Sequence, residues 1–211
     1  GRPIFRSELP MFDYSLDTRF DGVAERAALG YTPDDKVLMF FGYVRKYKGL
    51  DILLRAFLLI LKQIPEAKLL VVGEFYDKPE IYTDIVRDNG TLESVKFVNQ
   101  YVPNEEVGKY FAAADVMVQP YRSATNSGIL NVAYSFGVPA VVTRVGGLVE
   151  LVTDGETGIL VEPESPEAIA EGVVRFYKLR ETVNFSENIR ERVAKSGFNG
   201  ITEVFEGILG V

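Results

Sequence analysis

Short runs of apolar residues alternate along this chain with segments in which apolar and polar positions mix at the spacing of a helix. Continuous apolar runs of this kind are typical of strands that are buried on both faces of a parallel sheet. The predicted strands are residues 37–42, 69–73, 95–98, 116–119, 140–143 and 159–161. The predicted helices are residues 50–63, 80–87, 103–113, 129–136, 148–152 and 166–179. This alternation predicts an α/β fold: a Rossmann-like, doubly wound, mostly parallel six-stranded sheet with helices on both faces.

The two ends of the chain depart from this alternation. Residues 1–35 have weak periodicity and are interpreted as a linker or N-terminal segment. Residues 36–180 form the predicted α/β domain, and residues 181–211 are predicted to hold two more helices, near 186–194 and 200–209. We expect these final helices to pack on the domain or toward a part of the protein that this chain lacks.

The predicted helix at residues 50–63 is apolar nearly all round. A helix of that kind is buried on more than one side. Two interpretations remain open: the helix is sandwiched within its own domain, or it meets a partner surface.

Ligands of doubly wound sheets bind outside the carboxyl ends of the strands. Because parallel strands end at the same edge of the sheet, the segments that follow the predicted strands should share one rim. These segments are residues 42–48, 73–76, 100–102, 121–128 and 144–147. The candidate binding residues are therefore sought there.

Two of these segments suit an anion such as phosphate. Arg45 and Lys48 follow the first strand at a helix entrance, where cations are unfavourable unless an anion is bound. Ser127 and Gly128 precede a helix at Ile129, so unpaired backbone N–H groups and the positive end of the helix dipole face the same rim. Each segment alone has a competing interpretation, as a solvated basic turn and as an ordinary helix cap. Together they favour a diphosphate ligand.

Two glutamates lie on or near this rim. Glu74 ends a strand in a polar turn, where a carboxylate can accept hydrogen bonds from a ribose or sugar hydroxyl. The competing interpretation for Glu74 is a solvated loop carboxylate. Glu150 follows Gly146-Gly147, which is either a site where backbone approaches a ligand or a tight turn that leads into a helix. Both alternatives stay open for Glu150.

The composition excludes several classes of chemistry. The chain has no Cys and no His, so disulfides, thiolate or imidazole metal ligands and Ser–His catalytic arrangements are absent. Its net charge of −7 disfavours broad nucleic-acid binding. No run approaches the roughly 20 apolar residues of a membrane span. We therefore expect a cytoplasmic protein without a signal peptide and without nucleic-acid partners.

An ordered set of motifs carries a resemblance to a known family. The set comprises Phe41-Gly42 to Lys48-Gly49-Leu50, Val71-Val72-Gly73, Ala114-Asp115-Val116, Gly137-Val138-Pro139, Gly146-Gly147-Leu148-Val149-Glu150 and Asp154-Gly155-Glu156-Thr157-Gly158. Across about residues 36–179, the chain resembles the C-terminal, donor-binding domain of a family 4 retaining glycosyltransferase, which is one half of a GT-B fold.

The resemblance implies a function for residues 36–180 as a nucleotide-sugar-binding domain. The expected sugar donor is a UDP- or GDP-sugar, and the expected acceptor is a saccharide or a lipid-linked molecule. Arg45 and Lys48 match the family's cationic pair at the donor diphosphate, so they are the expected catalytic residues.

Further matches imply the contacts to the sugar donor. Backbone at residues 127–129 matches the phosphate-binding helix entrance, and Tyr101-Val102 matches the segment that contacts the base. The expected donor-binding residues are Gly42, Glu74, Tyr101, Val102, Asn126, Ser127, Gly128, Ile129, Asn131 and Glu150. No cofactor and no metal are expected, because the cationic pair and the helix dipole take the metal's charge-stabilising role.

The chain departs from the family pattern at two acidic positions. Most members carry two glutamates eight residues apart around this loop, and in this chain those positions hold Ala124 and Val132. Asn126 or Asn131 can supply a polar contact there but no negative charge. The chain is therefore either a member of a subgroup or a domain whose transfer activity is impaired, and the intact cationic pair favours the subgroup.

The second departure is length. The family's acceptor-binding N-terminal domain is absent from this chain, and residues 1–14 match the interdomain linker. The resemblance then implies that the absent half binds the acceptor and mediates any peripheral association with a membrane. This chain alone is expected to transfer no sugar.

The main interpretation is the donor-binding half of a retaining glycosyltransferase, and two other functions compete with it. The missing glutamates support a non-catalytic nucleotide-binding or interaction domain with a degenerate glycosyltransferase site. The sheet alone permits a dinucleotide-dependent oxidoreductase. Against that class, no G-x-G-x-x-G follows the first strand, where residues 42–49 hold cations instead.

Overall fold

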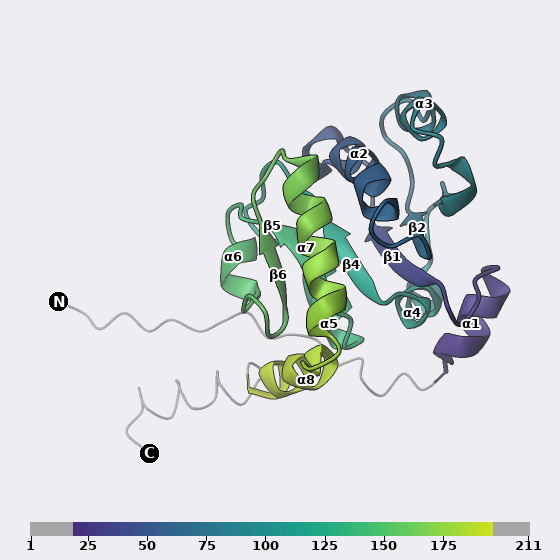
Figure 1. The fold of residues 1–211 in the computed structure, drawn as a ribbon. Helices are drawn as coiled ribbons and strands as arrows, with labels where there is room; N and C mark the ends of the chain where they lie inside the picture. The colour runs from purple at the N-terminus through teal and green to yellow at the C-terminus, as the bar shows by residue number, and fades with distance from the viewer. Residues whose placement is uncertain (1–18, 196–211) are drawn as a thin grey trace, which may run out of the picture.

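Six parallel strands in the order β3-β2-β1-β4-β5-β6 form the centre of the structure (Figure 1). The computed structural model describes residues 19–195. The strands are β1 (Lys36–Phe41), β2 (Ala67–Val72), β3 (Val95–Val98), β4 (Val116–Gln119), β5 (Ala140–Thr143) and β6 (Gly158–Val161). Every neighbouring pair is parallel; Met39 of β1, for example, lies beside Leu70 of β2 and Met117 of β4. The predicted fold class is confirmed, and the sheet is entirely rather than mostly parallel.

The described helices are α1 (Gly22–Ala28), α2 (Leu50–Leu61), α3 (Glu80–Asp88), α4 (Asn104–Ala113), α5 (Gly128–Ser135), α6 (Leu148–Leu151), α7 (Pro166–Leu179) and α8 (Phe185–Lys195), with two 3-10 helices, η1 (Lys46–Lys48) and η2 (Leu92–Ser94). α2 to α8 lie where the sequence pattern predicts helices, whereas α1 lies in the segment interpreted as a linker and packs against α4. Ser127 caps α5 and Ser165 caps α7, because each side chain accepts a hydrogen bond from the first turn of its helix. The predictions for residues 1–14 and 200–209 lie outside the described residues.

Helices cover both faces of the sheet. α2, α3 and α7 pack on one face, around Leu38 and Phe40 of β1. α4, α5 and α8 pack on the other face, around Val37 and Met39, which alternate with the first pair along the strand. In Figure 1, α7 passes in front of the strands and α8 lies below it. Because both faces of β1 are covered, its sequence is apolar without interruption.

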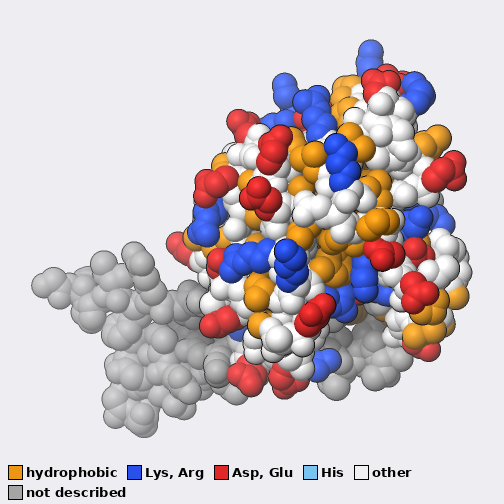
Figure 2. Space-filling view, in the orientation of Figure 1, with side chains coloured by type: hydrophobic (Ala, Val, Ile, Leu, Met, Phe, Trp, Pro, Cys, Tyr) orange, Lys and Arg blue, Asp and Glu red, His pale blue; other side chains and the backbone are white. Residues whose placement is uncertain are grey.

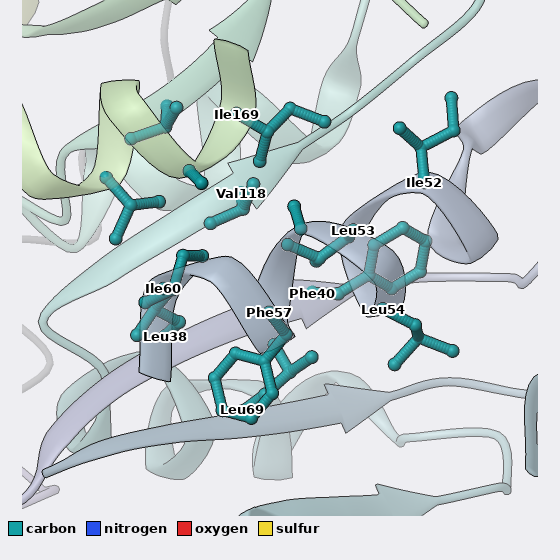
Figure 3. Close-up of a cluster of buried hydrophobic side chains, with 14 of the residues drawn as sticks. Leu38, Phe40, Ile52, Leu53, Leu54, Phe57, Ile60, Leu69, Val118 and Ile169 are labelled. Carbon is teal, nitrogen blue, oxygen red and sulfur yellow. The ribbon is translucent and has the colours of Figure 1, made fainter. Parts of the chain in front are cut away.

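α2 is the helix that is apolar nearly all round, and it is sandwiched within its own domain. Leu53, Phe57 and Ile60 are fully buried. Figure 3 shows them in the same cluster as Leu69 of β2 and Ile169 of α7. α2 also packs against α3. The first of the two interpretations is confirmed, and no partner surface is needed to explain the apolar residues.

Two acidic residues of the motif set have structural roles. Asp115 precedes β4, where it accepts a hydrogen bond from the backbone N–H of Val37 at 2.8 Å and pairs with Arg26 at 2.8 Å. Asp154 precedes β6 and pairs with Arg175 at 2.9 Å. Both lie at the amino ends of their strands, away from the rim on which a ligand is expected, so they stabilise the fold.

The face over α2 and α7 is drawn as a surface in Figure 2. Lys and Arg side chains lie there among Asp and Glu side chains, with hydrophobic side chains between them. On this face the described residues therefore form no broad basic area of the kind that binds nucleic acid electrostatically.

Candidate functional site

The strand order fixes where a ligand can bind. From β1 the chain continues into β2 on one side and later returns to β4 on the other, so the sheet has a topological switch point between β1 and β4. In open α/β sheets, ligands bind in the crevice outside the carboxyl ends of the strands at such a point. The loops on the two sides of this crevice are residues 42–49, after β1, and residues 120–127, after β4.

Two adjoining hollows open at this switch point. The first hollow has a volume of about 270 Å³ and lies among the segments after β1, β2 and β3 and the first turns of α5. The second hollow has a volume of about 460 Å³ and is lined by residues 123–129 with Tyr47, Lys48 and Tyr121. Lys48 and Ile129 line both hollows, so one ligand can extend across the two.

Lys48 is a buried cation at the junction of the hollows. It ends η1, and only 7% of its surface is exposed. Among residues 19–195 no carboxylate forms an ion pair with it, and its Nζ lies 5.8 Å from the centroid of the Tyr121 ring. Burial and, to a smaller extent, the charge of Arg45 lower the pKa of Lys48 to about 8. A buried cation without a counter-charge is unfavourable until an anion binds beside it.

Two glycines form the wall next to this cation. Gly42 has a φ of +104°, and a Cβ at that position would lie 3.0 Å from Nζ of Lys48 and 3.5 Å from Cγ1 of Ile129. Gly73 has a φ of +139°, and a Cβ there would lie 2.2 Å from the carbonyl oxygen of Gly42. A side chain at position 73 would displace the backbone of Gly42, and a side chain at position 42 would press on the end of the Lys48 side chain and strain the backbone, so both positions favour glycine.

The N-terminus of α5 borders the second hollow. Oγ of Ser127 accepts a hydrogen bond from the backbone N–H of Leu130 at 3.2 Å. Oδ1 of Asn126 accepts one from the backbone N–H of Ser127 at 2.7 Å, so this side chain shapes the turn. In the described part of the chain, the N–H groups of Gly128 and Ile129 donate to no acceptor, and both residues line the hollow. The helix entrance therefore presents two free N–H groups and the positive end of its dipole to an anion.

Gly146 and Gly147 pack against this loop rather than against a ligand. A Cβ on Gly146, which has a φ of +47°, would lie 1.6 Å from the carbonyl oxygen of Ala124. A Cβ on Gly147 would lie 2.5 Å from the carbonyl oxygen of Thr125. The pair lines neither hollow. Of the two interpretations of this pair, the structure supports the tight turn, whose close approach is to the protein's own backbone.

Arg45 lies outside both hollows. Its guanidinium stacks on the exposed ring of Tyr76, 4.4 Å from the ring centroid, and Tyr76 packs edge-on against Tyr43 at 5.1 Å. Tyr43 lines the first hollow, so Arg45 is held beside that hollow. Arg45 is near enough for its charge to act on Lys48. Of the predicted cationic pair, the structure places only Lys48 against the space that a ligand can fill.

Three other predicted contacts line the first hollow. Glu74 and Tyr101 are exposed, and Val102 is buried. Ile129 and Val132 add an apolar wall from α5. An apolar wall, an aromatic ring and a single carboxylate suit a nucleoside, which has a flat apolar base and a ribose with hydroxyl groups.

The structure places two predicted residues away from Lys48. Glu150 is exposed on α6 and lines neither hollow; its backbone carbonyl accepts a hydrogen bond from Arg192 at 2.8 Å. Asn131 of α5 lines neither hollow, and its buried Oδ1 has no hydrogen-bond partner among the described residues. These two residues are therefore not brought together with the rest of the candidate site.

Arg122 joins the loop after β4 to the start of α2. Its Nη1 and Nη2 donate to the two carboxylate oxygens of Asp51 at 2.9 and 2.8 Å, and Nη1 also donates to the carbonyl of Lys46 at 2.7 Å. These contacts fix η1, and therefore Lys48, relative to the loop before α5. Burial alone would raise the pKa of Asp51, but the hydrogen bonds and charge of Arg122 hold that pKa below its usual value.

We expect Asp51→Asn to lower the free energy of unfolding by about 1–2 kcal/mol at pH 7, because it weakens this ion pair. The contribution of Asp51 should be complete above pH ~3.9, the unfolded pKa, and should disappear as the pH falls through the lower folded pKa. Urea unfolding of the variant and of the unsubstituted protein measures this difference in free energy at pH 7 and at pH 3, where it should be smaller. Asp88→Asn, at an exposed aspartate that forms no ion pair in the described chain, is the control. Equal losses in the two variants at pH 7 would contradict the prediction.

The sequence interpretation missed Gln119 and Tyr121. Both are buried, and Nε2 of Gln119 donates to the hydroxyl of Tyr121 at 3.3 Å and to Oγ of Ser127 at 3.0 Å. Burial raises the pKa of Tyr121 to about 12, so its hydroxyl stays protonated at neutral pH. A glutamine at the end of an apolar strand is the signal that could have indicated a buried polar network beside the rim.

Within residues 19–195, no group of three or more His, Cys, Asp or Glu side chains is placed to hold a metal ion. No helix in that range is long and apolar enough to cross a membrane. The charged side chains that line the two hollows are Lys48 and Glu74. The positive potential available to a ligand there therefore comes from Lys48 and the dipole of α5, with Arg45 adding to it from beside the first hollow.

Comparison with known proteins identifies relatives of this chain. A sequence model of the family described as "Glycosyl transferases group 1" matches residues 35–178. A D-inositol 3-phosphate glycosyltransferase of Catenulispora acidiphila is 35% identical over 170 residues, which make up 77% of this chain and 40% of that protein. The chain therefore spans less than half the length of this curated relative.

Solved structures share the fold. The C-terminal domain of a glycosyl transferase group 1 family protein (LpcC) from Francisella tularensis matches with a TM-score of 0.73 at 21% identity, covering 89% of this chain and 97% of that domain. The HepE protein of Anabaena in complex with UDP-glucose matches with a TM-score of 0.76 at 18% identity, covering 96% of this chain and 56% of that one. At these identities the similarity establishes the fold, which corresponds to about half of the HepE chain.

Proposed function

The chain belongs to the family of group 1 glycosyl transferases, and from this premise we propose that it is the sugar-donor-binding part of a retaining glycosyltransferase. The sugar donor is a nucleotide-diphosphate sugar. The acceptor is a saccharide or a lipid-linked molecule, and a part of the protein outside this chain binds it. This chain alone transfers no sugar.

One observation carries the proposal. The buried Lys48 and the residues with free N–H groups, Gly128 and Ile129, line the same hollow, and Lys48 and Ile129 also line the adjoining one. An anion at the junction of the two hollows would give the buried cation a counter-charge and give the helix N-terminus an acceptor. A diphosphate meets both needs and leaves a nucleoside in the first hollow and a sugar in the second.

The lining of the first hollow supports this arrangement of the sugar donor. Tyr101 and Val102 contact the base, and Glu74 accepts hydrogen bonds from ribose hydroxyls. HepE, which shares the fold, is known in complex with UDP-glucose, and this supports a UDP-sugar as the first candidate. Asn126 contributes by shaping the turn before α5.

In the proposed reaction, the bond between the anomeric carbon and the diphosphate oxygen breaks, and the acceptor oxygen forms a bond to the same face of that carbon. Negative charge develops on the leaving diphosphate, where Lys48 and the N–H groups of α5 stabilise it more strongly than in the bound substrate. Arg45 adds a second positive charge when its exposed side chain leaves Tyr76. The departing diphosphate accepts the proton of the acceptor hydroxyl, which fits a chain without His, and Lys48, Arg45 and the dipole of α5 stabilise the leaving group without a metal or cofactor.

The direct experiment is calorimetric titration of the full-length protein with UDP, GDP and ADP. We expect one nucleotide to bind at least about tenfold more tightly than the others, a difference of about 1.4 kcal/mol. The variant Arg45→Ala should weaken that binding. With the matching nucleotide sugar and an acceptor, the product should keep the anomeric configuration of the donor, which NMR detects. Absence of binding by all three nucleotides would overturn the proposal.

Nucleotide affinity should depend on the protonation of Lys48. Only the protonated ammonium group attracts a phosphate oxygen, so affinity should be highest near pH 7 and should fall as the pH rises through the lowered pKa of about 8. Because the charge of Arg45 contributes to that lowering, Arg45→Ala should move the fall to higher pH. Titrations from pH 7 to pH 9.5 measure both effects. A constant affinity across this range would contradict the assignment of Lys48.

One observation favours the alternative, a non-catalytic nucleotide-binding domain. Ala124 lines the second hollow and Val132 lines the first. Most members of the family that this chain resembles carry glutamates at these two positions, and here neither position has a carboxylate. This alternative predicts that the full-length protein binds UDP and UDP-glucose equally and transfers no sugar. The proposed function predicts tighter binding of one nucleotide sugar and measurable transfer.

A further inference from the structure

Gln119 is a buried polar residue behind the second hollow. It is the last residue of β4, and 2% of its surface is exposed. Its Nε2 donates hydrogen bonds to Oγ of Ser127 at 3.0 Å and to the hydroxyl of Tyr121 at 3.3 Å. Its Oε1 is buried and has no partner among the described residues. Only the donor half of this amide is therefore used within the protein.

The amide determines what the Ser127 hydroxyl can do. A hydroxyl group has one proton to donate and two lone pairs that accept. Oγ of Ser127 accepts from the backbone N–H of Leu130 at 3.2 Å and from Nε2 of Gln119. Both acceptor positions are thus occupied, so the Ser127 proton can be donated to the neighbouring hydroxyl of Tyr121 or into the second hollow, which Ser127 lines.

We propose that Gln119 is a positioning residue, which orients the Ser127 hydroxyl as a hydrogen-bond donor to an anionic oxygen in the second hollow. This inference rests on the proposed function, in which that oxygen belongs to the diphosphate of the nucleotide sugar. Ser127 then acts beside the free N–H groups of Gly128 and Ile129 on the same oxygen atoms.

The unpartnered Oε1 distinguishes this role from a structural one. A buried acceptor without a partner is unfavourable for the folded state, and an apolar side chain of similar shape would avoid it. The neighbouring β4 residues Met117 and Val118 are apolar and buried, so the strand itself does not require an amide. Methionine would remove the unpartnered acceptor together with the two hydrogen bonds that Nε2 donates, whereas orientation of Ser127 needs the amide N–H.

The test is Gln119→Met in the full-length protein, with UDP titration and urea unfolding measured together. We expect UDP affinity to fall about tenfold, as for the loss of a hydrogen bond to a charged group, while the free energy of unfolding falls no more than in the control variant. Thr157→Val is the matched control, because Thr157 is also buried and its Oγ1 accepts from Tyr134 at 3.1 Å and from the N–H of Thr153 at 2.9 Å. This control lies in neither hollow, so it should lower stability and leave UDP affinity within about twofold.

A double-mutant cycle shows whether Gln119 acts through Ser127. Ser127→Ala should weaken UDP binding, and adding Gln119→Met to it should cause no further loss. Gln119→Glu should weaken binding more than Gln119→Met, because a carboxylate only accepts hydrogen bonds and would take the Ser127 proton away from the hollow.

Three results would show that Gln119 does not position Ser127, and a fourth would also overturn the proposed function. UDP binding by Gln119→Met at the affinity of the unsubstituted protein would overturn it and leave the proposed function intact. Independent, additive losses in the cycle would also overturn it, as would a loss of affinity in Thr157→Val equal to that in Gln119→Met. If the unsubstituted protein binds none of UDP, GDP and ADP, the proposed function and this inference both fail.

Discussion

Replacing Lys48 with methionine is expected to abolish tight nucleotide binding and to make the folded protein more stable. The ammonium group is buried without an ion-pair partner in the described chain, so methionine, which has a similar shape and no charge, removes an unfavourable burial. We expect a gain of about 1 kcal/mol or more in the free energy of unfolding at pH 7. The same change removes the buried cation that faces the diphosphate, and nucleotide affinity should fall about 100-fold, or about 2.7 kcal/mol.

Lys46→Met is the matched control for this experiment. Lys46 lies in the same 3-10 helix, carries the same charge and is exposed outside both hollows. Calorimetry and urea unfolding should therefore show little change in either quantity for this variant. The assignment of Lys48 fails if both variants weaken binding equally, because net charge rather than the buried position would then account for the effect.

Replacing Gly49 with alanine is expected to destabilise the protein by about 2–5 kcal/mol. Gly49 joins η1 to α2 with a φ of +69°, and a Cβ there would lie 2.0 Å from the carbonyl oxygen of Pro120. The obstructing atom belongs to the backbone directly after β4, so it cannot move aside as a flexible side chain can. The expected loss combines about 1–2 kcal/mol for the left-handed conformation with about 1–3 kcal/mol for overpacking.

Gly90→Ala separates these two contributions. Gly90 has nearly the same φ, +67°, and no atom lies within 4 Å of the position of its Cβ. Urea unfolding should show a loss of only about 1–2 kcal/mol for Gly90→Ala. A loss as large as that of Gly49→Ala would mean that the contact with Pro120 is not what requires glycine. Where Gly49→Ala still folds, it should also bind nucleotides weakly, because η1 and the loop after β4 would be pushed apart.

The positions of the strands could be predicted from the sequence because their burial leaves little choice. The apolar run at residues 37–42 corresponds to β1, whose central side chains pack alternately on the two faces of the sheet. A short continuous apolar run that ends in a glycine turn is typical of a strand buried on both faces. The caps of α5 and α7 could also be predicted, since Ser127 and Ser165 act within a single turn.

The part of the candidate site that depends on strand order could not be predicted. Arg122 meets Asp51 from 71 residues away, and Gln119 reaches Ser127 only because β4 ends beside the loop before α5. Hydrophobic periodicity specifies where strands lie along the chain but not which strands become neighbours. The stacking of Arg45 on a tyrosine was missed for the same reason, because no local pattern indicates which ring an exposed guanidinium will contact.

The position of β1 between β2 and β4 also affects how the protein is made. β2 ends at residue 72, whereas β4 ends at residue 119, so during translation the partner strand for one edge of β1 is synthesised long before the partner for the other. Until β4 emerges from the ribosome, the apolar residues 37–41 present unpaired backbone groups that can pair with another nascent chain. We therefore expect the yield of folded protein to depend on how quickly residues 73–119 are translated and on chaperones that cover this edge in the meantime.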